Sequence, residues 1–179
     1  TRSVDNQTVG IIGLGRIGQA IAHKLSPWNA KIVYHTRSKK NVVYTYYDDL
    51  TAMAKDCDVL ICITPGGPST HKIVNAKVME ALGPNGTLIN VSRGSVVDEA
   101  ALVTALQNGA LGWAGLDVFE DEPVVPQALR DLPNTVLLPH VGSGTVETRA
   151  AMGALTVNNL LQHLKDGTVI SAVPECAHI

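Results

Sequence analysis

The stretch VGIIGLGRIG at residues 9–18 is the most informative part of this sequence about its fold. Its first four residues form a short apolar run, which is typical of a buried strand. Three glycines follow with the spacing GxGxxG, and an amphipathic stretch over residues 16–25 comes directly after them. Because this weak motif gains meaning only between a strand and a helix, its position here predicts a strand, a tight glycine turn and a helix.

The rest of the chain alternates apolar runs with helical patterns. Continuous apolar strands are typical of a parallel sheet covered on both faces by helices. The predicted fold class is therefore α/β, a doubly wound parallel sheet of the Rossmann type. We expect one domain over residues 1–165 and a tail over residues 166–179, with loops at 65–68 and 121–126. The expected strands are 9–12, 31–35, 58–64, 87–91, 112–118 and 135–138, and the further helices are 98–108 and 144–165.

Composition excludes several function classes. The 179 residues are 45% hydrophobic and 17% charged, with a formal net charge of −2, as in a compact soluble domain. Without a basic run we expect no nucleic acid partner. No apolar stretch approaches the roughly 18–20 residues that span a bilayer, so we expect no membrane partner. The polar residues 1–8 lack a signal-peptide core, which favours a cytoplasmic protein.

Cysteine and histidine patterns give no sign of a metal site. The three cysteines form no CxxC pair, and the six histidines lack the spacing of metal ligands. Cys57 directly precedes the strand expected at residues 58–64, and Cys62 lies near the end of that strand. We interpret them as reduced packing residues.

The three glycines predict a dinucleotide site. Gly13 permits the tight turn, Gly15 lets the backbone approach a pyrophosphate, and Gly18 lets the helix pack closely on the strand. The N-terminus of the following helix would supply N–H donors and a positive dipole to the phosphates. The glycine loop therefore predicts that the chain binds a dinucleotide cofactor.

The end of the second strand indicates which dinucleotide. Sites for NAD place an acidic residue about 20 positions after the glycine loop, where it holds the ribose 2′-hydroxyl. Here Thr36 stands 18 positions after Gly18, and Arg37 and Ser38 follow it. Arg37 can hold a 2′-phosphate with its planar fork, with Ser38 as a further donor. The pattern favours NADP(H) over NAD(H), and a solvated basic turn with mixed cofactor use is the alternative.

Three polar residues follow three later strands. Arg93, Glu122 and His140 come after the fourth, fifth and sixth expected strands, where ligands of open α/β sheets bind. A protonated histidine can neutralise the alkoxide that forms when a ketone accepts hydride. A carboxylate raises the pKa of such a histidine, and an arginine can hold a substrate carboxylate. Taken singly, they could equally be a helix-edge salt bridge, a loop acid and a structural histidine.

Four motifs resemble the D-isomer-specific 2-hydroxyacid dehydrogenase family. They are GIIGLGRIG, INVSRGSVVDEAAL, GLDVFEDEP and LPHVGSGT, and the resemblance runs from about Thr8 to Val173. It implies that Arg93, Glu122 and His140 are the catalytic residues. It also implies that Asp117 holds the nicotinamide carboxamide. The further cofactor contacts that it implies are Arg16, Ile17, Thr64, Pro65, Val91, Ser92, Arg93, His140 and Gly142.

The chain departs from the family pattern in three respects. The acid that selects NAD is replaced by Thr36-Arg37-Ser38, as in the branch of NADPH-using glyoxylate/hydroxypyruvate and hydroxyphenylpyruvate reductases. PGGPST at residues 65–70 replaces the commoner PLTPET. Family members also carry an N-terminal segment that builds most of a substrate domain and much of a homodimer interface. We therefore expect this chain to be the cofactor-binding part, poorly active alone, with its tail turned towards the substrate domain.

Three hypotheses follow. The first is an NADPH-dependent reductase of a small 2-keto acid, such as glyoxylate or hydroxypyruvate, with His140 as the proton donor to the D-2-hydroxy acid product. The second is a dinucleotide-sensing scaffold like the corepressors that resemble this family. The third is an inactive NADP-binding module.

Overall fold

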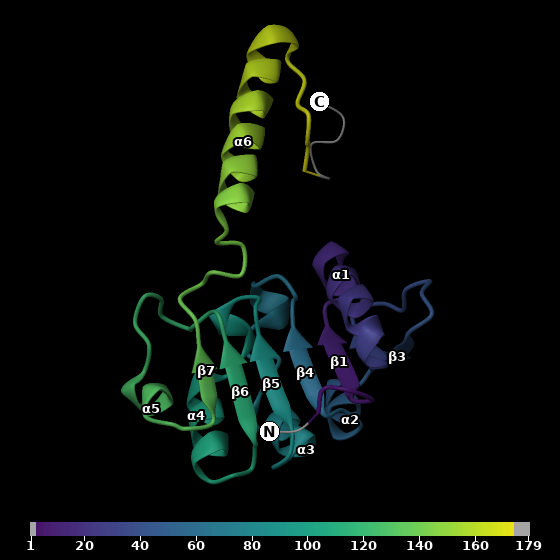
Figure 1. Ribbon diagram of the computed structural model, residues 1–179, viewed down its shortest axis with the longest axis vertical. Coiled ribbons are helices and arrows are strands. Elements are labelled where there is room, and N and C mark those ends of the chain that lie inside the picture. The colour runs from purple at the N-terminus through teal and green to yellow at the C-terminus, as the bar shows by residue number, and fades with distance from the viewer. Residues whose placement is uncertain (1–2, 174–179) are drawn as a thin grey trace. The chain divides into compact units, whose positions relative to one another are not determined.

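A computed structural model describes residues 3–173. Within that range the strands form one parallel sheet of seven strands, in the order β3-β2-β1-β4-β5-β6-β7 (Figure 1). The strand order reverses direction between β1 and β4, which is where doubly wound sheets bind ligands. The predicted fold class is confirmed. The strands are β1 (Thr8–Ile12), β2 (Lys31–His35), β3 (Thr45–Tyr47), β4 (Val59–Cys62), β5 (Thr87–Asn90), β6 (Trp113–Leu116) and β7 (Thr135–Leu137).

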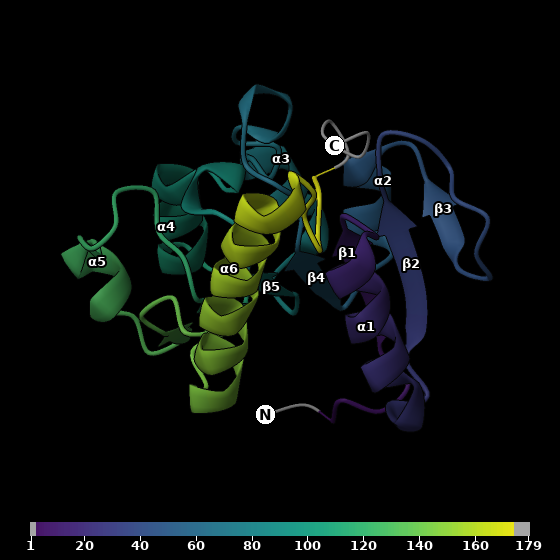
Figure 2. The ribbon, with the colours of Figure 1, turned by 90° about the horizontal axis from the view of Figure 1, so that it is seen from above.

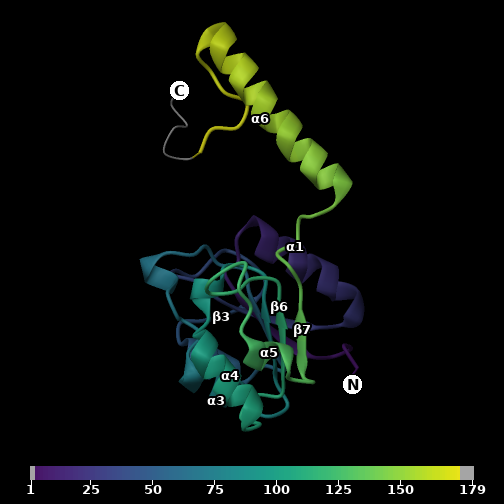
Figure 3. The ribbon, with the colours of Figure 1, turned by 90° about the vertical axis from the view of Figure 1, so that its left-hand side faces the viewer.

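Helices cover the two faces of the sheet unequally. α1 lies on one face, and α2, α3 and α4 lie on the other (Figures 2 and 3). Short 3-10 turns at Ser26–Trp28, Pro68–Thr70 and Gly94–Val96 complete the connections. The helices are α1 (Arg16–Leu25), α2 (Leu50–Lys55), α3 (Ala76–Leu82), α4 (Glu99–Gln107), α5 (Gln127–Arg130) and α6 (Val146–Asp166).

Each face of the sheet has its own core. The larger core packs β-strand residues such as Leu60 and Leu88 against Met53, Met79 and other side chains of α2, α3 and α4. The smaller core packs β1, β2 and β4 under α1. On the α1 side this cover stops at β4, so the same face of β5, β6 and β7 is more open. Trp113, for example, is 51% exposed although it belongs to β6.

The structure confirms the six expected strands, with ends that differ by up to two residues. Helices 16–25 and 98–108 are also confirmed, and the expected helix 144–165 is the observed α6. The sequence did not predict β3, α2, α3 or α5. β3 has only three residues and pairs with β2 alone, at the edge of the sheet. α3 had clear signals, because Asn75 caps its start and Gly83 ends it.

The chain divides into two compact units, one up to Pro139 and one from His140 onwards. The second unit consists mainly of α6, which Thr145 caps at its start and Gly167 ends with φ 78°. No residue of α6 is buried in the described structure. The domain boundary expected at residue 165 stays a prediction, and residues 174–179 of the expected tail lie outside the described range.

Candidate functional site

The glycine loop after β1 leaves no room for side chains at two of its glycines. Gly13 has φ 99°, and a Cβ added there would lie 2.8 Å from the backbone nitrogen of Thr64. A Cβ added at Gly18 would collide with the carbonyl oxygen of Gly13. Gly13 therefore allows the loop to pack against the segment after β4, and Gly18 allows α1 to pack closely against the end of β1.

The N-terminus of α1 fits a phosphate group. A Cβ added at Gly15 would meet no atom within 4 Å, so open space lies beside the backbone at this point. Gly15 is the N-cap, no side chain caps the helix, and its first turn holds no acidic residue. Orphan N–H groups and the helix dipole at such an end attract anions. By contrast, side chains of Asp49, Asn75, Asp98 and Thr145 cap α2, α3, α4 and α6.

Two residues at the start of α1 face solvent. Arg16 is exposed, and Ile17 is 62% exposed although it is apolar. An exposed isoleucine beside an uncapped helix start is available to contact a ligand.

The turn Thr36–Lys40 follows β2 and is called the basic turn below. Arg37 and Ser38 are exposed, and the Thr36 hydroxyl donates to the Ser38 carbonyl at 2.8 Å. His35, directly before the turn, accepts a hydrogen bond from the Gly13 backbone at 3.0 Å. The glycine loop and the basic turn are therefore tied together, as a cofactor that touches both would need.

The loops after β4 and β5 also meet. Thr64 and Pro65 follow β4, and a Cβ added at Gly66 would lie 3.1 Å from the Arg93 Cγ. Arg93 is exposed, and its Nη1 donates to the Ser92 carbonyl at 2.6 Å. Thus Arg93 reaches solvent beside the segment that carries Thr64 and Pro65.

Buried polar groups fix the loop after β5. The Asn90 Oδ1 accepts from the backbone nitrogen and the hydroxyl of Ser92, at 3.1 and 2.7 Å, and the Asn90 Nδ2 donates to the Arg93 carbonyl at 3.0 Å. Asn90 and Ser92 are 1% and 3% exposed, and Val91 between them is half-buried. Asn90 was not predicted from the sequence, although a polar residue in the apolar run 87–91 was the available signal.

The loop after β6 carries two of the predicted residues. Asp117 is 5% exposed, and its backbone nitrogen donates to the Asn90 carbonyl at 3.0 Å. Glu122 is exposed, and its Oε1 accepts from the Phe119 backbone nitrogen at 3.0 Å, which closes the loop. A Cβ added at Gly94 would collide with the Phe119 carbonyl, so the loops after β5 and β6 are in close contact.

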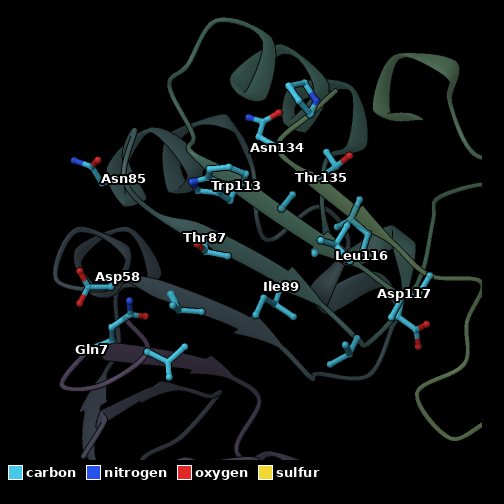
Figure 4. Close-up of a pocket in the computed structure, with 18 residues that line it drawn as sticks. Gln7, Asp58, Asn85, Thr87, Ile89, Trp113, Leu116, Asp117, Asn134 and Thr135 are labelled. Atoms are coloured by element: carbon cyan, nitrogen blue, oxygen red, sulfur yellow. The ribbon is translucent and has the colours of Figure 1, made fainter. Parts of the chain in front are cut away.

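A hollow of about 560 Å³ lies on the open face of β5, β6 and β7 (Figure 4). Asp117 lies at one end, and Gln7, Asp58 and Asn85 lie towards the other (Figure 4). Those three residues precede strands, so that end of the hollow is opposite to the edge that carries the glycine loop. Only the Asp117 end therefore belongs to the candidate site. The wall between the ends is largely apolar and includes Ile89, Trp113, Leu116 and Leu138.

His140 and Gly142 belong to the second unit. His140 is exposed and has φ 56°, a left-handed conformation that is uncommon outside glycine. The structure brings together the segments bearing Gly13 and Thr64, and those bearing Arg93 and Pro65. The grouping of His140 with Arg93 and Glu122 stays a prediction.

The two described cysteines are structural. Cys57 and Cys62 are buried and free, as the sequence predicted. Burial raises the pKa of each thiol to about 12, and for Cys57 the neighbouring Asp56 and Asp58 add to the rise. Neither thiol is a thiolate nucleophile at neutral pH. Within residues 3–173 no group of three or more acidic, histidine or cysteine side chains is placed to hold a metal ion, and no helix has the length and apolar character to cross a membrane.

Comparison with known proteins identifies the family of this chain. Residues 1–142 match the model of the NAD-binding domain of D-isomer-specific 2-hydroxyacid dehydrogenases. The chain belongs to this family. The resemblance found in the four sequence motifs is therefore confirmed.

Several relatives are reductases. The chain is 51% identical over 174 residues to hydroxyphenylpyruvate reductase from Plectranthus scutellarioides. The aligned region covers 97% of this chain and 56% of the relative. The chain is 48% identical to glyoxylate/hydroxypyruvate reductase A from Arabidopsis thaliana, with the same coverage. The chain thus spans a little over half the length of these relatives.

A solved structure of a relative contains a cofactor. The NADPH-dependent glyoxylate/hydroxypyruvate reductase from Sinorhizobium meliloti, in complex with NADP and malonate, is 55% identical with a TM-score of 0.94. The match covers 97% of this chain and 55% of that chain.

Proposed function

We propose that the protein carrying this chain reduces a small 2-keto acid to a D-2-hydroxy acid with NADPH, and that this chain binds the cofactor. Two features together carry the proposal. The helix that follows the glycine loop has no side-chain cap at its start, and the basic turn contains no acidic residue. A 2′-phosphate next to a carboxylate would be repelled, whereas Arg37 attracts it. The relatives named as reductases of hydroxypyruvate and hydroxyphenylpyruvate support the substrate class.

The cofactor would lie along the ends of β1, β2, β4, β5 and β6. The pyrophosphate would lie at the start of α1, near Gly15, Arg16 and Ile17. When bound, the reduced nicotinamide supplies a hydride. Beyond these, the residues that we propose to contact the cofactor are Thr36, Arg37, Ser38, Thr64, Pro65, Val91, Ser92, Arg93, Asp117, His140 and Gly142.

Three side chains would act on the substrate. Arg93 would hold the carboxylate of the keto acid in two parallel hydrogen bonds and polarise the neighbouring carbonyl. His140, in its protonated form, would give a proton to the carbonyl oxygen as negative charge develops there. Glu122 would orient the His140 ring and place a negative charge beside it. We also propose that the natural protein is a homodimer.

The proposal is tested by measuring NADPH oxidation by the natural protein, at its encoded length, with glyoxylate and hydroxypyruvate. We expect turnover by the wild type and a fall in kcat of about 10²–10⁴-fold in His140→Ala, with NADPH affinity kept. His23→Ala, which changes an exposed histidine on α1, is the matched control and should leave kcat unchanged.

Two results would contradict the proposal. Absence of turnover with every 2-keto acid tried would remove the reductase function. Turnover by His140→Ala at the wild-type rate would leave the function standing and remove His140 as the proton donor.

A further inference from the structure

We propose that Tyr34 is a positioning residue for cofactor choice, because its buried hydroxyl holds the basic turn in the shape that receives a 2′-phosphate. The inference rests on the proposed preference for NADPH and deepens it. Arg37 and Ser38 would contact the phosphate, and Tyr34 would act through the backbone that carries them.

The Tyr34 hydroxyl closes the far end of the basic turn. Tyr34 belongs to β2 and is fully buried. Its Oη accepts a hydrogen bond from the Lys40 backbone nitrogen at 2.8 Å and donates to the Lys40 carbonyl at 3.2 Å. A hydroxyl can do both at once. A single side chain therefore satisfies the donor and the acceptor of one backbone residue, six positions further along the chain.

A second tyrosine hydroxyl holds the near end. Tyr46 of β3 pairs in register with Tyr34, and the two ring centroids are 5.4 Å apart. The Tyr46 hydroxyl donates to the Thr36 carbonyl at 3.2 Å. Neighbouring strands thus hold both ends of the turn, and the residues between Thr36 and Lys40 are exposed.

The turn is also held relative to the rest of the predicted cofactor site. β2 ends at His35, whose carbonyl accepts from the Gly13 backbone at 3.0 Å. This contact fixes the start of the basic turn beside the glycine loop. The tyrosine hydroxyls extend the constraint through the turn to Lys40.

A fixed turn favours the phosphorylated cofactor selectively. Binding a phosphate by long cationic side chains costs conformational entropy, and a rigid backbone reduces that cost. NADH has no 2′-phosphate, so its binding would not depend on the shape of the turn in this way. Loosening the turn should therefore weaken NADPH binding and leave NADH binding nearly unchanged.

The neighbouring residue offers a matched control. Side chains alternate along a strand, so Tyr47 points away from Tyr46. Its hydroxyl donates to the Asp56 carboxylate at 2.8 Å, at the end of α2. Tyr47→Phe removes the same oxygen from the same strand without touching the basic turn.

The test is a set of fluorescence titrations with NADPH and, separately, NADH, on the natural protein and on its Tyr34→Phe, Tyr46→Phe and Tyr47→Phe variants. We expect the ratio of the NADH to the NADPH dissociation constant to fall about three- to tenfold in Tyr34→Phe. A smaller fall is expected in Tyr46→Phe, and none in Tyr47→Phe. Should Tyr34→Phe fail to fold, Tyr46→Phe carries the same test, because its ring is only partly buried.

The outcomes separate this inference from the cofactor preference on which it rests. A wild type that binds NADH as tightly as NADPH would overturn both. A wild type that prefers NADPH, with the same ratio in folded Tyr34→Phe and Tyr46→Phe variants, would overturn the inference alone. Equal losses for NADPH and NADH in these variants would also overturn it, because they would indicate a general structural role.

Discussion

The unit up to Pro139 and helix α6 contain the same kinds of apolar side chains but use them differently. In the first unit, leucines such as Leu60 and Leu88 are fully buried in the core of the sheet. In α6, Leu155, Leu160 and Leu164 are between 44% and 73% exposed. Burial of apolar surface is the main force that fixes a chain in one conformation. The first unit therefore holds its own loops in place, whereas α6 gains no such fixation from the described structure.

The two units also carry different parts of the proposed function. The residues proposed to bind the pyrophosphate and the 2′-phosphate lie in the first unit, at the start of α1 and in the basic turn, where hydrogen bonds and close backbone contacts fix them. The proposed proton donor, His140, begins the second unit. Recognition of the pyrophosphate and the 2′-phosphate should thus depend on the first unit, and turnover on both units.

The largest effect expected from this comparison is on stability. Leu60→Ala removes a fully buried side chain from the core and should lower the free energy of unfolding by about 2–5 kcal/mol. Leu164→Ala removes the same atoms from a residue that is 73% exposed and should change it by less than about 0.5 kcal/mol. Urea denaturation of both variants checks this. Equal losses of unfolding free energy in the two variants would mean that Leu164 is as well buried as Leu60.

A pH titration of stability tests the burial of the first unit in another way. The native state keeps the Cys62 proton until about pH 12, whereas the unfolded chain releases it above about pH 9. The free energy of unfolding should therefore fall as pH rises above 9, and this thiol should contribute about 1.4 kcal/mol per pH unit to the slope.

Cys62→Ala should remove the contribution of this thiol and leave that of Cys57, so the slope becomes shallower, even though the variant is less stable at pH 7. Urea denaturation at several pH values between 7 and 10.5 gives both slopes. Parallel curves for the wild type and the variant would contradict the buried, neutral thiol.

The smallest effect is expected at the surface of the first unit. The Lys72 Nζ lies 3.2 Å from the Glu120 Oε1 and 3.8 Å from the Asp98 Oδ1, and all three side chains are about one-third exposed. The pKa of Lys72 is raised, chiefly by its hydrogen bond to Glu120. Solvent and salt screen such pairs.

Lys72→Met should therefore lower the melting temperature slightly at low salt and not at molar salt. Lys77→Met, at an exposed lysine on α3, is the control. A large fall in the melting temperature of Lys72→Met that is the same at low and molar salt would mean that solvent and salt do not screen this ion-pair cluster.

Some elements could be predicted from the sequence to the residue, because their signals are local. Helix α1 follows a glycine loop, and β2 is an apolar run between polar neighbours. β3 could not be predicted, because residues 45–47 become a strand only by pairing with β2.

The roles of two buried polar groups were also hidden. Tyr34 looks like an ordinary core residue in sequence, since the bond from its hydroxyl to Lys40 exists only in the folded turn. Asn90 likewise acts through contacts with Ser92 and Arg93 that the fold creates. Residues that position a loop are therefore harder to predict from sequence than charged residues that would contact a ligand directly.

We propose above that the basic turn of the first unit recognises a 2′-phosphate. The most direct test is to titrate the Arg37→Ala variant of the natural protein with NADPH and NADH, with Lys24→Ala on α1 as the control. We predict a loss of NADPH affinity of about tenfold or more with NADH affinity unchanged, and no change for either cofactor in Lys24→Ala. Equal losses for NADPH and NADH, or no loss at all, would mean that Arg37 does not read the 2′-phosphate.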